Sequence, residues 1–351
     1  MSGRKAATLF SSHAEDVAAS TQRRRERGLL AAAALGEAHL HVAALAGDVL
    51  SLGAFHRALD DVEREAVWRR HTGGRATAAG RGFVVVTLAL PHRSALVDAD
   101  RLALKPEQVM NRCVRGLLDA LRRLGVDPVY PGLDAVTHAR RTLALLSFVE
   151  AEGGTTLFQA VLAVRATFAD TARLLDRLDP AGRVPSFLLG AEEVICVEEV
   201  LGPTLLPELE PATFAAHVAA GCLNAFGTTS TGLDPEVTDV LASAYESEPD
   251  PLRLPASRGH GAHASGRLGP IEALALVEGG RVRAVSLAGD FLAPAGFVDD
   301  LSAALAGVTA EAEAIAAAVS RFLDGDAHYL LGLLPAELAD VIARAAAEAS
   351  A

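Results

Sequence analysis

The run from Val67 to Ala76 carries the residues of this sequence best suited to bind an anion. Two adjacent arginines, Arg69 and Arg70, precede a Gly73-Gly74 turn. A Gly-Gly pair can take φ > 0 and leaves no side chain in the way of a ligand. Consecutive amides in such a turn form an anion-binding concavity, and guanidinium groups offer two parallel hydrogen bonds to phosphate or carboxylate. The stretch predicts an anion-binding loop, although a Gly-rich hairpin turn with solvated arginines fits the same residues.

Strands and helices around this loop must position it. A β-prone run over 84–90 follows the loop directly. Two strands, 38–45 and 49–53, and a short helix over 54–65 precede it. The apolar spacing also predicts strands over 143–148 and 157–164, and helices over 14–35, 105–125, 166–178, 191–200, 212–226 and 233–246. This mixture indicates an α+β domain with mixed sheets flanked by helices.

A second, smaller α+β domain is expected at the C-terminal end. Proline and glycine gather in the segment 249–269, which is typical of a linker. A hairpin of strands and then two helices are predicted beyond it, over 271–277, 282–287, 297–306 and 309–323. The expected organisation is a main domain over 1–248, a linker over 249–269 and an accessory domain over 270–351.

Composition and charge narrow the classes of function. The net charge of −12 argues against general nucleic-acid binding, which needs a basic face to displace counterions. The three cysteines include no CxxC pair, so neither a disulfide framework nor a zinc site is expected. His39 and His41 would share one face of a strand, but a third metal ligand is not evident. No apolar run is long enough to span a bilayer and no signal peptide is evident, so we expect a cytoplasmic protein without a membrane partner.

The stretch around Arg69 and Arg70 resembles the arginine-arginine-Ser/Thr-Gly-Gly loop of the lipoate-protein ligase A family, within the wider biotin and lipoate ligase group. The resemblance extends over about residues 14–335, and the C-terminal strand-strand-helix-helix order with its Gly289-Asp290-Phe291 resembles the family's accessory domain. It implies an enzyme that binds lipoate and ATP with Mg2+, forms lipoyl-AMP, and transfers the acyl group to a lysine. The acceptor would be a lipoyl carrier domain, in the glycine cleavage H protein or a 2-oxoacid dehydrogenase acyltransferase.

The resemblance also assigns roles to individual residues. Asp134 matches the acidic residue that lies close to the adenylate in the family. The residues matching the anion-binding loop, and expected to bind the nucleotide phosphate and the acyl carboxylate, are Arg69, Arg70, Thr72, Gly73, Gly74, Arg75, Ala76 and Gly82. Donors at these positions would stabilise the negative charge that develops during adenylation.

Several positions depart from the family pattern. Arg75 stands where the family has a third loop glycine, and Gln159-Ala160 replaces a His-Gly pair. The active lysine is expected just before the strand 143–148, where this chain has Arg140-Arg141-Thr142, and its only lysines are Lys5 and Lys105. Arg141 would keep a positive charge that can hold a carboxylate or phosphate, but arginine is bulkier, planar and effectively never deprotonated, so it cannot act as a base.

Two functions therefore follow from the sequence. The first is a lipoate-protein ligase-like acyltransferase with an altered active site, in which Arg141 and Asp134 are the catalytic candidates. The second is a non-catalytic homologue that binds a lipoyl or acyl-nucleotide ligand, or a lipoylated partner, without adenylating anything. The loop and the accessory domain favour the first function, whereas the missing lysine favours the second.

Overall fold

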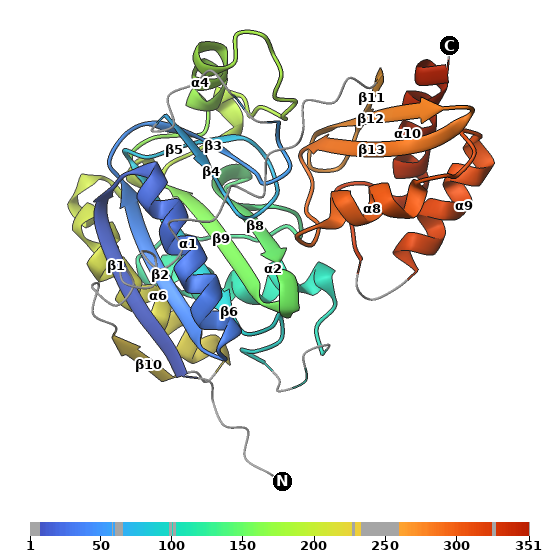
Figure 1. Ribbon diagram of the computed structural model, residues 1–351. Helices are drawn as coiled ribbons and strands as arrows, with labels where there is room; N and C mark the ends of the chain where they lie inside the picture. The colour runs from blue at the N-terminus through green and yellow to red at the C-terminus, as the bar shows by residue number, and fades with distance from the viewer. Residues whose placement is uncertain are drawn as a thin grey trace.

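Strand β6 (Phe83–Leu90) lies in the middle of the main sheet and is buried along its whole length. Its uninterrupted apolar sequence follows from that position, since a strand covered on both faces needs no polar alternation. The computed structural model describes residues 8–57, 59, 66–97, 100, 103–226, 229–232, 260–324 and 328–350. Among the described residues the chain has an α+β fold of mixed sheets flanked by helices (Figure 1).

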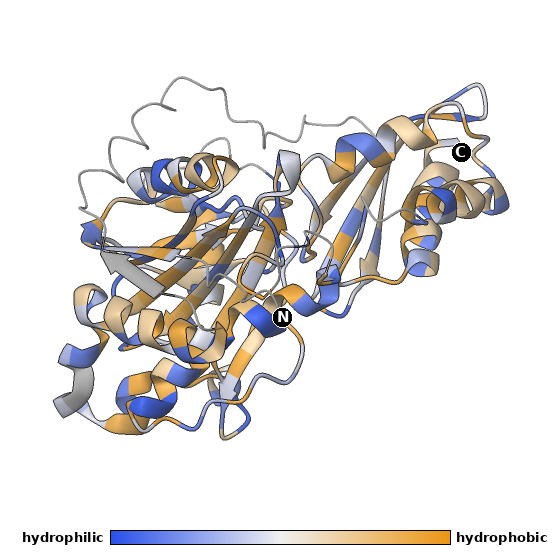
Figure 2. Ribbon diagram, turned by 90° about the horizontal axis from the view of Figure 1, so that it is seen from below, coloured by the Kyte–Doolittle hydropathy of each residue, from blue (hydrophilic) through white to orange (hydrophobic). Residues whose placement is uncertain are grey.

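The main sheet has seven strands in the order β10-β1-β2-β6-β9-β8-β7. Its other strands are β1 (Thr8–Val17), β2 (Ala38–Leu45), β7 (Ala135–His138), β8 (Arg141–Glu150), β9 (Thr156–Ala163) and β10 (Thr229–Gly232). β1 pairs in parallel with β2 and β10, while β2, β6, β9, β8 and β7 pair in antiparallel succession. Figure 2 shows the hydrophobic colour concentrated on the central strands of this sheet, as expected for a sheet between two layers.

Helices cover both faces of this sheet. Helix α1 (Ala19–Ala34) packs on one face through Leu29 and Ala33. The opposite face is covered by α2 (Pro106–Cys113), α3 (Arg115–Arg123) and α6 (Pro211–Phe226). The remaining helical segments are α4 (Asp170–Leu178), α5 (Val197–Leu201) and the 3-10 turns η1 (Glu152–Gly154), η2 (Ala191–Glu193) and η3 (Pro203–Leu209).

A second, three-stranded sheet carries the anion-binding loop predicted from the sequence. β3 (Val49–Leu52) lies in its centre, parallel to β4 (Val67–Arg69) and antiparallel to β5 (Thr77–Ala79). The loop 70–76 joins β4 to β5, so both of its ends are anchored in the same small sheet.

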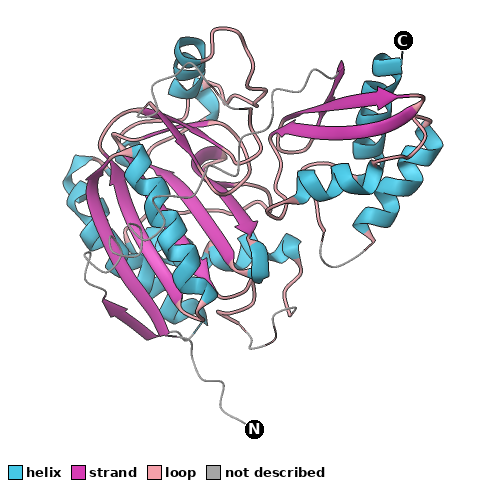
Figure 3. Cartoon of the chain, viewed as in Figure 1, coloured by secondary structure: helices cyan, strands magenta, loops and turns pink. Residues whose placement is uncertain are grey.

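The C-terminal residues form a separate layer of sheet and helices (Figure 3). Its sheet has the order β11 (His260–Ser265), β12 (Pro270–Glu278) and β13 (Arg281–Gly289), paired antiparallel. The helices that pack with it are α8 (Phe297–Leu305), α9 (Ala312–Leu323) and α10 (Pro335–Ser350). Phe55 of the N-terminal part joins this core and stacks on Phe291 with ring centroids 4.4 Å apart.

The structure differs from the sequence expectations at several elements. Residues 14–17 end strand β1 and do not begin the first helix, because they pair with β2. The expected helix over 105–125 divides at Val114 into α2 and α3. Strand β11 falls inside the segment expected to be a linker, and α10 was not predicted. The expected helix over 233–246 and most of the one over 54–65 lie outside the described residues. Among the described helices, none has the length and apolar character needed to cross a bilayer.

Candidate functional site

The Gly73-Gly74 turn is in direct contact with the C-terminal sheet and helices, which we call the C-terminal domain below. The Gly74 amide donates a hydrogen bond of 2.8 Å to the Phe291 carbonyl oxygen. A Cβ atom at Gly73 would lie 2.3 Å from that same oxygen, and Gly74 has φ of +85°. The two glycines therefore allow a backbone segment to approach the turn. In this structure that segment is Phe291 of the same chain, which follows β13.

Arg70 is buried and directs its guanidinium toward the interior of the loop. Nη1 donates to Ser51 Oγ at 2.8 Å, and Nη2 donates to the carbonyl oxygens of Gly73 at 3.1 Å and Arg75 at 2.8 Å. Its Nε has no acceptor among the described residues. Burial lowers the pKa of Arg70 to about 10, although the acidic groups of Glu26, Asp290 and Asp134 act in the opposite direction.

Arg75 reaches across the loop to Asp134, which is itself 2% exposed. Arg75 Nε lies 2.6 Å from Asp134 Oδ2, and Nη2 lies 3.0 Å from Oδ1. The guanidinium also stacks over the ring of Phe187, 4.9 Å from its centroid. Burial raises the pKa of the Asp134 carboxyl, and the charge of Arg75 opposes that shift.

These groups enclose a small cavity between the loop and the main sheet. The cavity measures about 10 Å³, room for one water molecule. Its lining residues are Arg70, Arg75, Thr77, Asp134, Leu145, Leu146, Ser147 and Val161. The structure thus brings together three of the predicted site residues, Arg70, Arg75 and Asp134, in a closed arrangement with no room for a nucleotide.

A buried network ties the loop to helix α1 and the main sheet. The Thr72 hydroxyl lies 2.8 Å from both Ser147 Oγ and Gln159 Oε1. Gln159 Nε2 in turn donates to Glu26 at 2.9 Å, and Glu26 also accepts from the Trp68 indole at 2.9 Å. Complete burial raises the pKa of Glu26 to about 7. Thr72 is therefore a buried anchor for the loop, held by residues from α1, β8 and β9.

A second network fastens the C-terminal domain to the loop through Asp290. The Gly53 amide donates to His56 Nδ1 at 3.0 Å, so the proton of His56 lies on Nε2, which faces Asp290 Oδ1 at 3.0 Å. Asp290 also accepts hydrogen bonds from the Ser186 hydroxyl and, at 2.6 Å, from the Phe187 amide. His56 and Asp290 are both fully buried. We call these four residues, His56, Ser186, Phe187 and Asp290, the domain clasp.

Besides the glycine turn and Arg141, four of the predicted site residues lie outside the cavity lining. Arg69 donates to the carbonyl oxygens of His56 and Arg57, both at 2.6 Å, and so braces the segment after β3. The Ala76 amide donates to Ser186 Oγ of the clasp at 3.0 Å. Gly82, with φ of +79°, forms the turn before β6 and accepts from the amides of residues 164 and 165. Thr72 belongs to the buried network. These residues shape and hold the loop.

Arg141 lies away from this group. It begins β8, is 36% exposed, and pairs with Glu199 at 3.2 Å on the surface. It does not line the cavity that contains Asp134. The structure therefore does not bring together the two residues expected to be catalytic, and the cation that faces Asp134 is Arg75.

The cysteines, His39 and His41 belong to the packed interior and to local hydrogen bonds. All three cysteines are buried, and burial raises the pKa of each thiol, to about 12 for Cys222. His39 pairs with Glu37, and His41 lies 2.9 Å from Ser12 Oγ. Within the described residues, no three His, Cys, Asp or Glu side chains are arranged to hold a metal ion.

Sequence reasoning missed the residues that meet the loop from distant segments. Glu26, Ser51 and Ser186 carry no local pattern that separates them from ordinary helix and turn residues. Asp290 did carry a signal, because Gly289-Asp290-Phe291 stood out at the end of a predicted strand. Its contacts with the loop depend on how the two domains pack, which no short-range pattern encodes.

Comparison with known proteins gives matches to solved structures but none to families or curated sequences. No family profile and no curated protein matches the sequence. The crystal structure of P. falciparum LipL1 in complex with lipoate matches with a TM-score of 0.63 at 11% identity, over 89% of this chain and 94% of that one. A lipoate-protein ligase A bound with ATP matches with a TM-score of 0.48 at 13% identity, over 68% and 94% of the two chains.

A bi-partite lipoate protein ligase from Thermoplasma acidophilum, studied with its E2 lipoyl domain, also matches. Its TM-score is 0.48 at 13% identity, over 68% of this chain and 91% of that one. Because the match to LipL1 covers 89% of this chain, it extends past residue 260 into the C-terminal sheet and helices. This chain therefore has the fold of the lipoate-protein ligases, within the wider group of biotin and lipoate ligases.

Proposed function

We propose that this protein is a lipoate-protein ligase-like acyltransferase, which attaches lipoate or octanoate to a lysine of a lipoyl carrier domain through an acyl-adenylate. The observation that carries the proposal is the environment of Arg70. Its guanidinium is buried beside the Gly73-Gly74 turn, and its Nε lacks an acceptor among the described residues. A buried cation with an unused donor is stabilised by an anion, and a carboxylate or phosphate has the matching geometry.

The chemistry would proceed in two steps. The acyl carboxylate attacks the α-phosphorus of ATP and pyrophosphate leaves, which gives the acyl-adenylate. The amine of the carrier lysine then attacks the acyl carbon, AMP leaves, and the nitrogen loses a proton as the amide forms. Arg70 and Arg75 would stabilise the charge on the phosphate and carboxylate oxygens in both steps. Arg75 in this scheme supplies the cation that the family obtains from lysine.

The proposal requires the loop to open. The Phe291 carbonyl must leave the Gly74 amide, and Arg75 must turn from Asp134 toward the ligand, because the closed cavity of about 10 Å³ admits neither substrate. Asp134, already paired with Arg75, is the only acidic group among the described residues that line the cavity. A protein-held Mg2+ therefore does not fit these residues, and any Mg2+ would be carried by the ATP phosphates.

The acceptor in this proposal is a lipoyl carrier domain, in the glycine cleavage H protein or a 2-oxoacid dehydrogenase acyltransferase. The support is the fold shared with LipL1 over both domains. Lys105 does not line the cavity, and the acceptor lysine in this proposal belongs to the carrier domain.

A second function is favoured by a specific observation. The Arg75–Asp134 pair occupies the site with two hydrogen bonds, and no lysine is among the described residues that line it. A protein that binds a lipoyl or acyl-nucleotide ligand, or a lipoylated partner, needs the anion-binding donors but not the lysine. This non-catalytic homologue would hold its ligand without releasing pyrophosphate.

An intact-mass assay separates the two functions. The protein is incubated with ATP, Mg2+, lipoate or octanoate, and a purified carrier domain, while pyrophosphate release is followed in parallel. A carrier whose lysine is replaced by arginine is the control. A mass gain of one acyl group on the normal carrier alone, with pyrophosphate release, supports the ligase. Ligand binding without either signal supports the non-catalytic homologue and rejects the ligase.

A further inference from the structure

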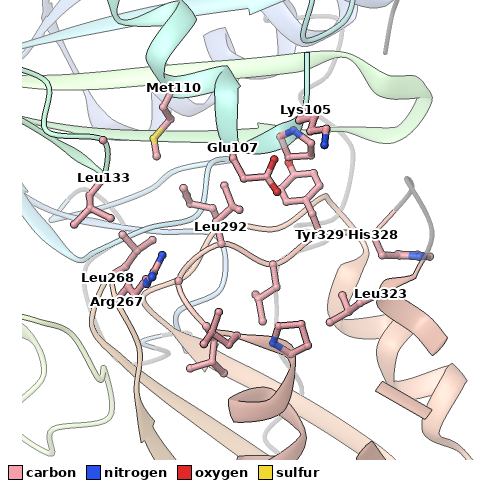
Figure 4. A pocket seen from close by; sticks show the side chains of 18 of the residues that line it. Lys105, Glu107, Met110, Leu133, Arg267, Leu268, Leu292, Leu323, His328 and Tyr329 are labelled. Atoms are coloured by element: carbon pink, nitrogen blue, oxygen red, sulfur yellow. The ribbon is translucent and has the colours of Figure 1, made fainter. Parts of the chain in front are cut away.

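A second cavity, of about 680 Å³, lies where the two domains meet. Its N-terminal wall includes Lys105 at the start of helix α2, Met110 within that helix, and Leu133 (Figure 4). Its C-terminal wall includes Arg267, Leu268 and the segment 328–335. The volume lies within the range of small-molecule sites, and this cavity is far larger than the one beside Asp134.

The floor of this interdomain cavity is apolar. Met110, Leu268 and Leu292 line it and are almost entirely buried. Tyr329 is 8% exposed, and its hydroxyl interacts with Glu150. The nearby Glu150 carboxylate and, above all, burial raise the pKa of Tyr329 well above its ordinary value. The apolar floor therefore suits a hydrocarbon chain.

The charged side chains around the cavity differ in whether they form ion pairs. Arg93 is paired with Glu150 at 3.1 Å, and His328 faces Asp300 at 3.4 Å. By contrast, the exposed side chains of Lys105 and Arg267 form no ion pair within the described ranges.

Glu107 also lines the cavity and lies near Lys105 in Figure 4. One carboxylate against two cations leaves a single positive charge in excess. Arg267 and Leu268 lie together on the other side of the view, where no acidic side chain is labelled. The planar guanidinium of Arg267 can bind a carboxylate through two parallel hydrogen bonds. A ligand with one negative charge is thus matched better than a dianion.

We propose that the interdomain cavity is a ligand site for an amphipathic monocarboxylate, with the carboxylate held by Arg267 and the apolar chain placed over Met110, Leu268 and Leu292. The site is distinct from the Arg70 loop and goes beyond the proposed function. Its walls come from both domains, and Leu292 also lies against the loop, 3.6 Å from where a Cβ of Gly74 would stand.

The scarcity of lysine gives a direct probe of occupancy. Lys105 lines the cavity, and the only other lysine is Lys5. Limited labelling with an amine-reactive ester, followed by peptide mass spectrometry, reports the reactivity of each lysine separately. Saturating octanoate is expected to slow the labelling of Lys105 at least threefold and leave that of Lys5 unchanged. Octylamine, with the same chain and the opposite charge, should leave both rates unchanged.

Substitutions then assign the carboxylate. Arg267→Gln should weaken octanoate binding at this site about tenfold by calorimetry, Arg267→Lys should weaken it less, and the matched surface substitution Arg283→Gln should have no effect. Arg70→Ala must leave the protection of Lys105 intact, which separates this site from the ligase site. Protection that survives Arg267→Gln, or is abolished by Arg70→Ala, overturns the proposal. Equal protection by octylamine also overturns it, since binding would then be driven by the chain alone.

Discussion

Arg75 binds Asp134 through two hydrogen bonds, from Nε to Oδ2 and from Nη2 to Oδ1, and both side chains are nearly buried. The pair joins the loop after β4 to the first residue before β7, segments that lie 59 positions apart in sequence. A buried pair of this geometry holds the loop in one conformation and neutralises the acidic group beside Arg70. The predicted anion-binding loop is thus held in its closed form by one of its own arginines.

Replacing Arg75 by glycine should destabilise the closed state and enlarge the cavity. Removal of one partner from a buried ion pair leaves an uncompensated charge, which costs about 3–5 kcal/mol. Urea unfolding of Arg75→Gly should therefore show a clear loss of stability. The double variant with Asp134→Asn should recover much of the loss, because the orphaned carboxylate is gone. Additive losses in the double variant would contradict a direct coupling between the two residues.

Arg70→Ala should weaken the binding of a non-hydrolysable lipoyl-adenylate analogue at least tenfold, since a buried guanidinium beside the glycine turn is lost. Calorimetry on the folded variant measures the change. Arg141→Ala is the matched control, because that side chain is partly exposed and paired with Glu199 on the surface. A larger effect of Arg141→Ala than of Arg70→Ala would return the catalytic cation to the position expected from the resemblance.

Glu26 should make stability fall as pH rises from about 4.5 to about 7. Its pKa is about 7 in the folded protein, against an ordinary value of 4.5, so between these values the folded state holds a proton that the unfolded chain has released. Stability therefore decreases with pH over this window, by at most about 3 kcal/mol from this group. Unfolding of Glu26→Gln, measured from pH 4.5 to 8, should show a flatter dependence. An identical slope in both proteins would mean that Glu26 is not the group responsible.

Gly73→Ala should push the C-terminal domain away from the loop. The new Cβ would stand 2.3 Å from the Phe291 carbonyl oxygen, a distance that forces one backbone to move. Hydrogen exchange at the Gly74 amide should then become faster, and stability should fall by about 1–3 kcal/mol. Gly47→Ala is the control, because a Cβ there meets nothing within 4 Å. Unchanged exchange at residue 74 would show that the contact with Phe291 contributes little.

Residues with a strong local pattern were predicted correctly. The apolar run of β6, the hairpin of β12 and β13, and helices α8 and α9 lie where their periodicity placed them. The start of the chain was predicted wrongly over 14–17, because these polar and small residues adopt a strand only through pairing with β2. Helix α10 was missed, although its alanine-rich sequence has a high helix propensity.

The site was predictable only in outline. The glycine turn marked the loop, and Arg70, Arg75 and Asp134 do meet beside it. The partners that decide its state come from β13, α1 and the segment around Ser186, and these contacts are set by tertiary packing. Arg69 and Arg70 illustrate the limit. They are adjacent in sequence, yet one braces the segment after β3 while the other enters the cavity, since neighbouring residues of an extended chain point to opposite sides.

The Phe291 carbonyl has a consequence for kinetics. A ligand that needs the Gly74 amide competes with an acceptor that is tethered to the same chain and cannot diffuse away. At low concentration such a ligand associates at a rate proportional to its concentration. At high concentration the observed rate levels off at the first-order rate with which the chain releases its own amide. Supplying more ligand beyond that point changes the final occupancy but not the speed at which it is reached.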